Sequence, residues 1–209
     1  MSRIDLSLYL VTDPRARFGV VETVRMAAEN GATIIQLRDK QADDATLIAQ
    51  AKTLKEILKP LNIPLIINDR IDVAIAARAD GLHIGQSDGD VQAARARLGP
   101  DAILGLSIEA LSQLDKVSGL DVDYFGVGPV LATATKQDHS EPTGFDGLAR
   151  IIAQAEKDCV AIGGLKQQHL RAVFRAGAKG AAVVSAITMA KNPAEATKAL
   201  RQEWENAAL

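Results

Sequence analysis

Acidic and basic residues that could bind a phosphorylated ligand stand directly after short apolar runs of the chain. Asp69 follows one such run and Asp88 follows the next, while the basic residues are Arg38, Lys40 and Lys136. Two carboxylates on neighbouring strand ends suit a hard divalent cation such as Mg²⁺, which takes oxygen ligands and keeps some waters. Three basic side chains facing them favour a diphosphate. The roughly three negative charges of a diphosphate, two positive charges of Mg²⁺, three basic side chains and two carboxylates sum to about zero.

Each of these residues also has a purely structural interpretation. Asp69 could cap a helix that starts near Asp72, and Asp88 could cap a helix that starts at Val91. The three basic side chains could be solvated surface charges. The capping alternative stays open for either aspartate taken alone, whereas the set as a whole favours a site for a metal and a polyphosphate.

The elements that must position these residues repeat one pattern of short apolar runs and longer amphipathic segments. The runs are uniformly apolar, as expected of parallel strands buried on both faces. The predicted strands are Leu8–Val11, Thr33–Leu37, Pro64–Ile67, Gly81–Ile84, Ile103–Leu106, Tyr124–Val127, Val160–Ile162 and Ala181–Val184. The predicted helices are Val21–Glu29, Ala45–Leu58, Asp72–Ala77, Val91–Leu98, Ala110–Val117, Phe145–Ala155, Gln167–Ala176 and Ala194–Asn206.

Strand starts recur about every 25 residues, the length that one strand, one crossover helix and two tight loops require. Eight such units predict an α/β fold, a single (β/α)8 TIM barrel over residues 1–209. An open doubly wound sheet is the alternative, but segment 12–19 after the first strand lacks its glycine-rich phosphate turn. The longest irregular stretch, Leu131–Thr143, is predicted to be a binding loop that closes over the site.

Glycines near the last two predicted strands indicate a second phosphate site. Gly163-Gly164 ends the seventh strand, and Gly180–Ser185 spans the eighth. In many barrels the backbone amides at these places, with the N-terminus of a short helix, hold a phosphate. The alternative is that Gly163-Gly164 only makes a tight turn. His83 is predicted to be a packed, hydrogen-bonded histidine rather than a catalyst.

Composition limits the possible partners. The 209 residues are 47% hydrophobic and 24% charged with a net charge of −2, which excludes disorder and argues against nucleic acid. No apolar stretch is long enough to span a membrane and no signal peptide is visible, so a cytoplasmic protein with small-molecule substrates is expected. Cys159 is predicted to be a buried, inert thiol. Trp204 could pack on the barrel or between chains, so a homo-oligomer stays open.

These motifs, taken together, closely resemble the thiamine-phosphate synthase family. The resemblance runs from about Leu8 to Ile187 with every motif in family order. It rests on segments 36–40 (QLRDK), 68–70 (NDR), 80–86 (DGLHIGQ), 133–136 (TATK), 162–164 (IGG) and 183–185 (VVS). The resemblance implies a barrel enzyme of thiamine biosynthesis, a transferase in which a thiazole phosphate displaces pyrophosphate from hydroxymethylpyrimidine diphosphate, giving thiamine phosphate.

The resemblance also implies roles for single residues. Asp69 and Asp88 match the Mg²⁺ ligands. The residues that match the pyrimidine diphosphate site are Gln36, Leu37, Arg38, Asp39, Lys40, Asn68, Ser107 and Lys136. Those that match the thiazole phosphate site are Thr133, Ala134, Thr135, Gly164, Val184 and Ser185. Arg38, Lys40 and Lys136, with the metal, would neutralise the leaving pyrophosphate and so act in catalysis.

Two other functions remain as alternatives. A thiazole-phosphate tautomerase shares the barrel but has a histidine shortly after the fifth-strand serine, whereas Ser107 is followed here by Ile108 and Glu109. A non-catalytic barrel that binds thiamine precursors is the other form of this alternative. A different phosphate-binding barrel, such as an isomerase or an aldolase, would need no metal, and an aldolase would need Lys40 or Lys136 with a lowered pKa.

Overall fold

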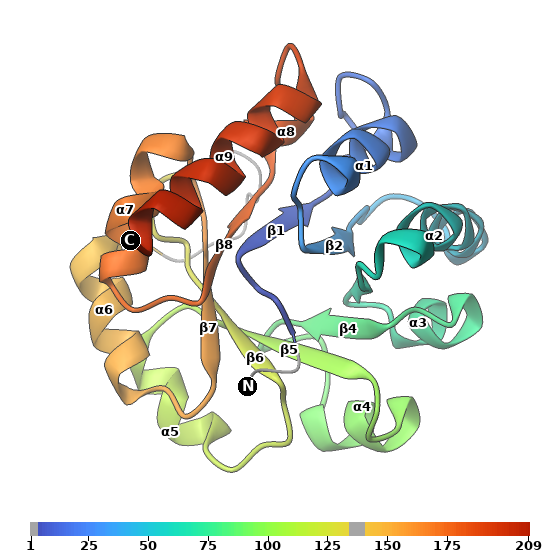
Figure 1. The fold of residues 1–209 in the computed structure, drawn as a ribbon. Helices are drawn as coiled ribbons and strands as arrows, with labels where there is room; N and C mark the ends of the chain where they lie inside the picture. The colour runs from blue at the N-terminus through green and yellow to red at the C-terminus, as the bar shows by residue number, and fades with distance from the viewer. Residues whose placement is uncertain (1–3, 134–140) are drawn as a thin grey trace.

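A closed barrel of parallel strands forms the centre of the computed structural model, which describes residues 4–133 and 141–209. Within these residues eight strands pair in sequence order, and the last strand pairs with the first (Figure 1). The strands are β1 Leu8–Val11, β2 Ile34–Leu37, β3 Leu65–Asn68, β4 Gly81–Ile84, β5 Ile103–Ile108, β6 Tyr124–Val127, β7 Asp158–Ile162 and β8 Gly180–Val183. The predicted (β/α)8 barrel is confirmed, with no open sheet edge.

Helices surround the barrel and connect successive strands (Figure 1). They are α1 Val20–Glu29, α2 Asp44–Leu58, α3 Ile71–Ala77, α4 Val91–Leu98, α5 Leu114–Val117, α6 Gly144–Gln154, α7 Leu170–Arg175, α8 Ser185–Thr188 and α9 Pro193–Ala207. The predicted helix over 110–117 is shorter, because its start is a 3₁₀ turn at Leu111–Gln113; Gln167–His169 likewise precedes α7. The short helix α8 directly after β8 is absent from the predicted set.

Alternation along the strands divides the buried residues into two layers. Tyr9, Ile34 and Tyr124 point into the barrel and pack together there. Leu10 and Ile35, the next residues along β1 and β2, belong instead to the larger layer between the strands and the helices. Since both faces of each strand are covered by apolar side chains, the strands are uniformly apolar in sequence.

The N-terminal ends of the strands are joined by a repeated side-chain contact. The residue before each of β2, β4 and β6 gives its own N–H to a carbonyl in the first two residues of the preceding strand, and its side chain accepts the N–H of that same residue. This pattern holds for Thr33 with Leu8 (3.2 Å to the side chain), Asp80 with Leu65 (2.8 Å) and Asp123 with Leu104 (2.7 Å). These side chains therefore satisfy strand N–H groups at the end of the barrel remote from the candidate site.

Arg95 of α4 binds the same Asp123 carboxylate that accepts the Leu104 N–H of β5. Its guanidinium bonds Asp123 at 2.7 Å and the Ala102 carbonyl at 2.6 Å, and only 11% of its side chain is exposed. Asp121 also pairs with Arg95, at 3.3 Å, but its side chain is 75% exposed. Removal of Asp123 would therefore leave the mostly buried guanidinium of Arg95 without its less exposed partner, and water could compensate for that loss only poorly.

Two predictions on single residues have a structural outcome. Cys159 is buried, and burial raises the pKa of its thiol to about 12, as expected for an inert thiol. Trp204 packs within the chain: its ring meets Phe174 of α7 edge-on, with centroids 5.5 Å apart, and it is buried. Among the described residues, no helix has the length and apolar character needed to cross a membrane.

Asp123→Ala should lower the free energy of unfolding by about 2–4 kcal/mol, because the Leu104 N–H and Arg95 each lose a partly buried partner. Asp121→Ala, the matched control on the same arginine, should cost less than about 1 kcal/mol, since an exposed ion pair contributes little. Urea denaturation followed by circular dichroism measures both. Equal losses in the two variants would contradict the role given to Asp123.

Candidate functional site

A cavity opens at the rim formed by the C-terminal ends of the strands, the position of sites in such barrels. Its volume is about 160 Å³. Eleven of the predicted site residues line it: Gln36, Arg38, Lys40, Asn68, Asp69, Asp88, Ser107, Thr133, Gly164, Val184 and Ser185. Gly163 and His83 line it as well. Residues that were predicted from separate stretches of sequence thus lie around one space.

Neither aspartate caps a helix. The N-cap of α3 is Arg70, which makes no side-chain capping bond, and the N-cap of α4 is Asp90, whose carboxylate accepts the Ala93 N–H at 2.7 Å. Asp88 instead accepts the Gly85 N–H at 2.7 Å within the loop after β4. The capping alternative is therefore wrong for both residues, and both carboxylates remain at the cavity.

The backbone at Asp69 holds its carboxyl in place. Asp69 has a φ of 63°, a left-handed conformation that costs a non-glycine residue free energy and is often found at functional sites. Its N–H donates to the His83 carbonyl at 2.9 Å, which continues the β3–β4 pairing one residue beyond the end of β3. Asp69 is thereby held next to the β4 loop that carries Asp88.

Asp88 disfavours the charge of the Asp69 carboxyl. The pKa of Asp69 is raised above its ordinary value, first by burial and then by a hydrogen bond with Asp88 and its negative charge. Lys40 and Arg38 act in the opposite direction, and Lys40 Nζ lies 3.6 Å from Asp69 Oδ2. The carboxyl pair is thus incompletely neutralised by its own protein neighbours, an arrangement that a bound cation would relieve.

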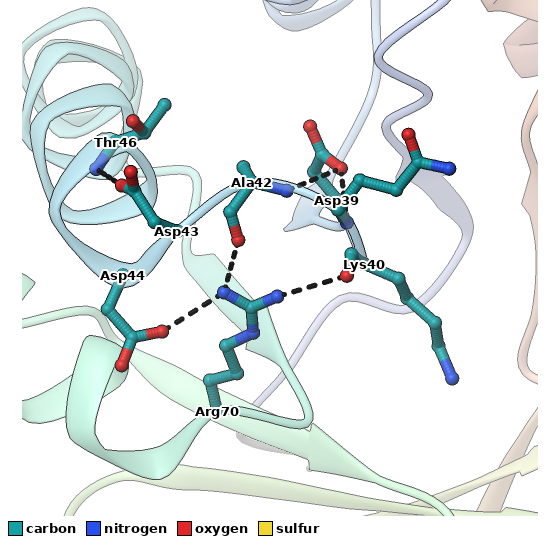
Figure 2. A network of polar contacts seen from close by, with 8 residues as sticks. Asp39, Lys40, Ala42, Asp43, Asp44, Thr46 and Arg70 are labelled. Carbon is teal, nitrogen blue, oxygen red and sulfur yellow. Dashed lines mark hydrogen bonds and ion pairs between the residues drawn. The ribbon is translucent and has the colours of Figure 1, made fainter.

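Lys40 stands on a loop between β2 and α2 that other side chains hold in shape. Asp39 Oδ1 accepts the N–H groups of Gln41 (2.9 Å) and Ala42 (3.2 Å). Arg70, across the loop, donates to the carbonyls of Ala42 (2.5 Å) and Lys40 (3.2 Å), as Figure 2 shows. In Figure 2 the Lys40 side chain extends away from this network. Lys40 lines the cavity.

Two members of the predicted diphosphate set do not line the cavity. Leu37 alternates with Gln36 along β2, and its side chain is buried in the layer between strands and helices. Asp39 uses its carboxylate for the loop described above. Continuous motif residues cannot all face one space, because successive side chains of a strand point to opposite faces.

Arg38 is positioned through its backbone. Thr12, at the end of β1 and almost fully buried, accepts the Arg38 N–H with its hydroxyl at 2.9 Å. Thr12 also lines the cavity. The sequence interpretation did not include Thr12, although its place directly after the first strand matches the pattern by which the other residues were found.

Four further residues of the cavity lining were given no binding role from the sequence. Tyr9, His83, Gly126 and Glu109 line the cavity. His83 is hydrogen-bonded on both ring nitrogens, to Tyr124 Oη at 3.0 Å and to Ser107 Oγ at 2.9 Å. The predicted hydrogen bonding of His83 is therefore present, but its ring also borders the space that a ligand would occupy.

Gly163 and Gly164 have both a conformational and a packing requirement. Their φ angles are 107° and 65°, which favour glycine. A Cβ on Gly163 would come within 2.6 Å of Pro129 Cα, and one on Gly164 within 2.6 Å of the Ala132 carbonyl oxygen. The pair therefore allows the loop after β6 to pack against the end of β7, so a turn and a close approach are both real features here.

The predicted loop after β6 is described only in part. Thr133 lines the cavity. Ala134, Thr135 and Lys136, which were predicted to bind substrate, lie outside the described residues. The role of the whole stretch as a closing loop stays a prediction.

Comparison with known proteins identifies the family. A family model described as thiamine monophosphate synthase matches residues 8–187. The chain belongs to this family. The thiamine-phosphate synthases of Azorhizobium caulinodans and Xanthobacter autotrophicus are 49% and 50% identical to it, each over 94% of both chains. The solved thiamine phosphate pyrophosphorylase from Pyrococcus furiosus superposes with a TM-score of 0.89 at 34% identity, covering 98% of each chain.

These relatives confirm the family predicted from the motifs. The prediction of a transferase of thiamine biosynthesis, a thiamine-phosphate synthase, is confirmed with it. The synthases also match the chain over nearly its whole length, so the resemblance is not confined to the phosphate-binding motifs.

Gly164→Ala should lower the free energy of unfolding by about 2–4 kcal/mol, because the new Cβ adds a clash with the loop after β6 to the strain of a positive φ. Gly119→Ala is the matched control: its φ is 71° and nothing lies within 4 Å of the added Cβ, so only the strain of about 1–2 kcal/mol applies. Thermal and urea unfolding measure the difference. If Gly164→Ala costs no more than the control, the packing argument fails.

Proposed function

We propose that the protein joins hydroxymethylpyrimidine diphosphate to a thiazole phosphate in the cytoplasm, releasing pyrophosphate and forming thiamine phosphate in a Mg²⁺-dependent reaction. The observation that carries the proposal is the meeting of opposite charges in one cavity: Asp69 and Asp88 face Arg38 and Lys40 at the ends of strands β2 to β4. Such a set suits a metal-bound diphosphate.

The donor set fits Mg²⁺. Asp69 and Asp88 offer carboxylate oxygens from adjacent loops. Burial and the nearby Asp88 disfavour the negative charge of Asp69, and a bound cation would stabilise that charge. In the described residues no group of three or more His, Cys, Asp or Glu side chains could hold a metal ion. Mg²⁺ commonly takes one or two carboxylates and completes its shell with waters and substrate phosphate oxygens, so two protein ligands suffice.

The charges of the cavity are placed for departure of pyrophosphate. When bound, Mg²⁺ would supply Lewis-acid neutralisation of the phosphate oxygens. Arg38 and Lys40 stabilise the negative charge that grows on the leaving oxygen as the carbon–oxygen bond breaks. The electron-rich aminopyrimidine carries the positive charge left on its methylene carbon, so the proposed reaction is largely dissociative. Lys136 is proposed to add a third cation.

The other end of the cavity suits the second substrate. Gly163, Gly164, Val184 and Ser185 line it, and helix α8 begins at Ser185. Backbone amides at the start of a helix lack intrahelical acceptors and are available to an anion. We propose that Gly164, Val184 and Ser185, with Thr133, Ala134 and Thr135, hold the thiazole phosphate, while Gln36, Asn68 and Ser107 hold the pyrimidine.

The proposed reaction requires no general base. The attacking atom is a neutral ring nitrogen with a lone pair, and no proton has to leave it when the new carbon–nitrogen bond forms. Positioning of the two substrates and electrostatic stabilisation then supply the acceleration. The two ends of the cavity would hold both substrates in one water-poor space, which protects the cationic intermediate from water.

The alternatives fit the site less well. An aldolase of the Schiff-base type needs a neutral amine, whereas the Lys40 ammonium pairs with the Asp69 carboxylate. A tautomerase would use the histidine that is absent after Ser107, where Ile108 and Glu109 follow. Glu109 does line the cavity, so product analysis must include the thiazole isomers.

The proposal is tested by incubating the protein with both precursors and Mg²⁺ and measuring thiamine phosphate and pyrophosphate. Lys40→Ala should lower kcat/KM about 100-fold, because it removes a cation from the leaving group. Lys52→Ala, on the exposed side of α2, is the matched control and should retain the wild-type rate. No product from the wild type, beside an active reference synthase, would refute the proposed function.

Removal of divalent metal with a chelator should abolish turnover, and added Mg²⁺ should restore it. Asp69→Asn should raise the Mg²⁺ concentration for half-maximal activity at least about tenfold, because one charged ligand is lost. Asp72→Asn is the control: Asp72 lies three residues beyond Asp69 in the chain, is exposed and pairs with Arg97, so its substitution should leave the requirement unchanged. Full activity after chelation would refute the role of the metal.

A further inference from the structure

A chain of side-chain hydrogen bonds crosses the inside of the barrel beneath the cavity. Gln36 Nε2 donates to Tyr9 Oη at 2.9 Å, and Tyr9 Oη lies 2.8 Å from Tyr124 Oη. Tyr124 Oη lies 3.0 Å from His83 Nδ1, and His83 Nε2 lies 2.9 Å from Ser107 Oγ. Five side chains from β2, β1, β6, β4 and β5 are thus connected through the centre of the fold.

One order of donors gives every proton within these bonds an acceptor. In that order Tyr9 Oη accepts from the Gln36 amide and gives its own proton to Tyr124 Oη; in the reverse order Tyr9 would accept both bonds, and its proton would have no acceptor among them. Tyr124 Oη then gives its proton to His83 Nδ1, which must be the unprotonated nitrogen of the ring. The proton of the neutral ring is therefore on Nε2 and points at Ser107 Oγ. Ser107 accepts that bond and can turn its own proton toward the cavity.

Burial keeps both phenols in the form that this order requires. Tyr9 and Tyr124 are almost fully buried, at 1% and 0% exposure. Burial raises the pKa of each phenol far above its ordinary value, although their mutual hydrogen bond and the Gln36 bond lower that of Tyr9 somewhat. Each hydroxyl therefore keeps its proton and donates one bond at all physiological pH values.

Two strand glycines make room for the middle of the chain. A Cβ on Gly105 would lie 2.5 Å from His83 Nδ1 and 2.2 Å from Tyr124 Cζ. It would therefore occupy the place of the hydrogen bond between His83 and Tyr124. A Cβ on Gly126 would lie 2.9 Å from His83 Cε1. Neither glycine has a positive φ. Glycine weakens a strand, so these two positions indicate that the space they leave for His83 and Tyr124 matters.

We propose that Tyr124 and Tyr9 are positioning residues that hold His83 as the neutral Nε2–H tautomer, so that the Ser107 hydroxyl is presented to the substrate as a hydrogen-bond donor. The part that concerns the substrate rests on the proposed function, in which Ser107 binds the pyrimidine. The part that concerns the tautomer is a property of the free protein and can be measured without turnover.

The tautomer is read from the ¹⁵N NMR spectrum of the free protein with labelled histidine at mildly alkaline pH. The chain has three histidines, so His83→Asn identifies the signals of His83. The wild type should show a single neutral form with the proton on Nε2. Tyr124→Phe should give a mixture that includes the Nδ1–H form, because Nδ1 loses its donor. A wild-type ring protonated on Nδ1 or on both nitrogens, or a Tyr124→Phe ring that stays wholly Nε2–H, would overturn the proposal.

Kinetics distinguish positioning from general destabilisation. Tyr124→Phe should raise KM for the pyrimidine diphosphate about five- to tenfold, the effect of one lost hydrogen bond, and leave KM for the thiazole phosphate unchanged. Ser107→Ala should give the same selective change. Equal changes in both KM values, or none, would overturn the substrate part. An inactive wild type would refute the proposed function yet leave the tautomer result standing.

Thr197→Val is the matched control for loss of a buried hydroxyl. Thr197 is fully buried in α9, away from the cavity lining, and its Oγ1 donates to the Pro193 carbonyl at 2.7 Å. Thr197→Val should lower the free energy of unfolding about as much as Tyr124→Phe does, while the His83 spectrum and both KM values stay as in the wild type. A changed tautomer in this variant would show that the spectrum reports stability alone and would overturn the proposal.

Discussion

Closure of the parallel sheet is the constraint on which the rest of this structure depends. Because β8 pairs with β1, every strand has a neighbour on each side, and all carboxyl ends meet at one rim. The register then decides which residues are neighbours there: Asn68 of β3 lies beside His83 of β4, and the next N–H, that of Asp69, still bonds the His83 carbonyl. Two carboxylates that are nearly twenty residues apart in sequence meet for this reason. Their chemistry follows from hydrogen bonds of the backbone.

The barrel and several residues of the candidate site could be predicted from the sequence, because buried parallel strands leave a regular pattern in it. Strands buried on both faces form short apolar runs, and a unit of constant length makes these runs recur, so β1, β4 and β6 have the predicted bounds. Asp69, Asp88 and Lys40 were found because each follows such a run. The same uniformity hides which strand residues point inward. Tyr9 and Tyr124 therefore could not be distinguished from packing residues, and Leu37 could not be separated from Gln36 within one motif.

The glycines of the chain illustrate a second limit. Gly163 and Gly164 are conspicuous in sequence because they are adjacent, and their positive φ angles make them turn residues. Gly105 and Gly126 stand singly inside strands with ordinary backbone angles, and what they avoid lies on other strands. The need for glycine at these two positions comes from the side chains of His83 and Tyr124 on neighbouring strands. It leaves no local pattern in the sequence, because these side chains meet the glycines only after the barrel has closed.

The cavity combines two kinds of polar interaction with opposite energetic character. The chain from Gln36 to Ser107 is buried at Gln36, Tyr9 and Tyr124 and reaches the cavity at His83 and Ser107. Each of these groups has a partner, so the chain adds order without leaving a charge in the barrel. The carboxyls of Asp69 and Asp88 repel each other at the rim, and one of them sits on a strained residue. Strain and like charge at the rim destabilise the empty site, and the proposed Mg²⁺ would relieve the repulsion between the carboxyls. A barrel whose lower layers are fully satisfied can tolerate that cost where the ligand binds, which explains why neutral polar groups lie inside and charged groups lie at the mouth.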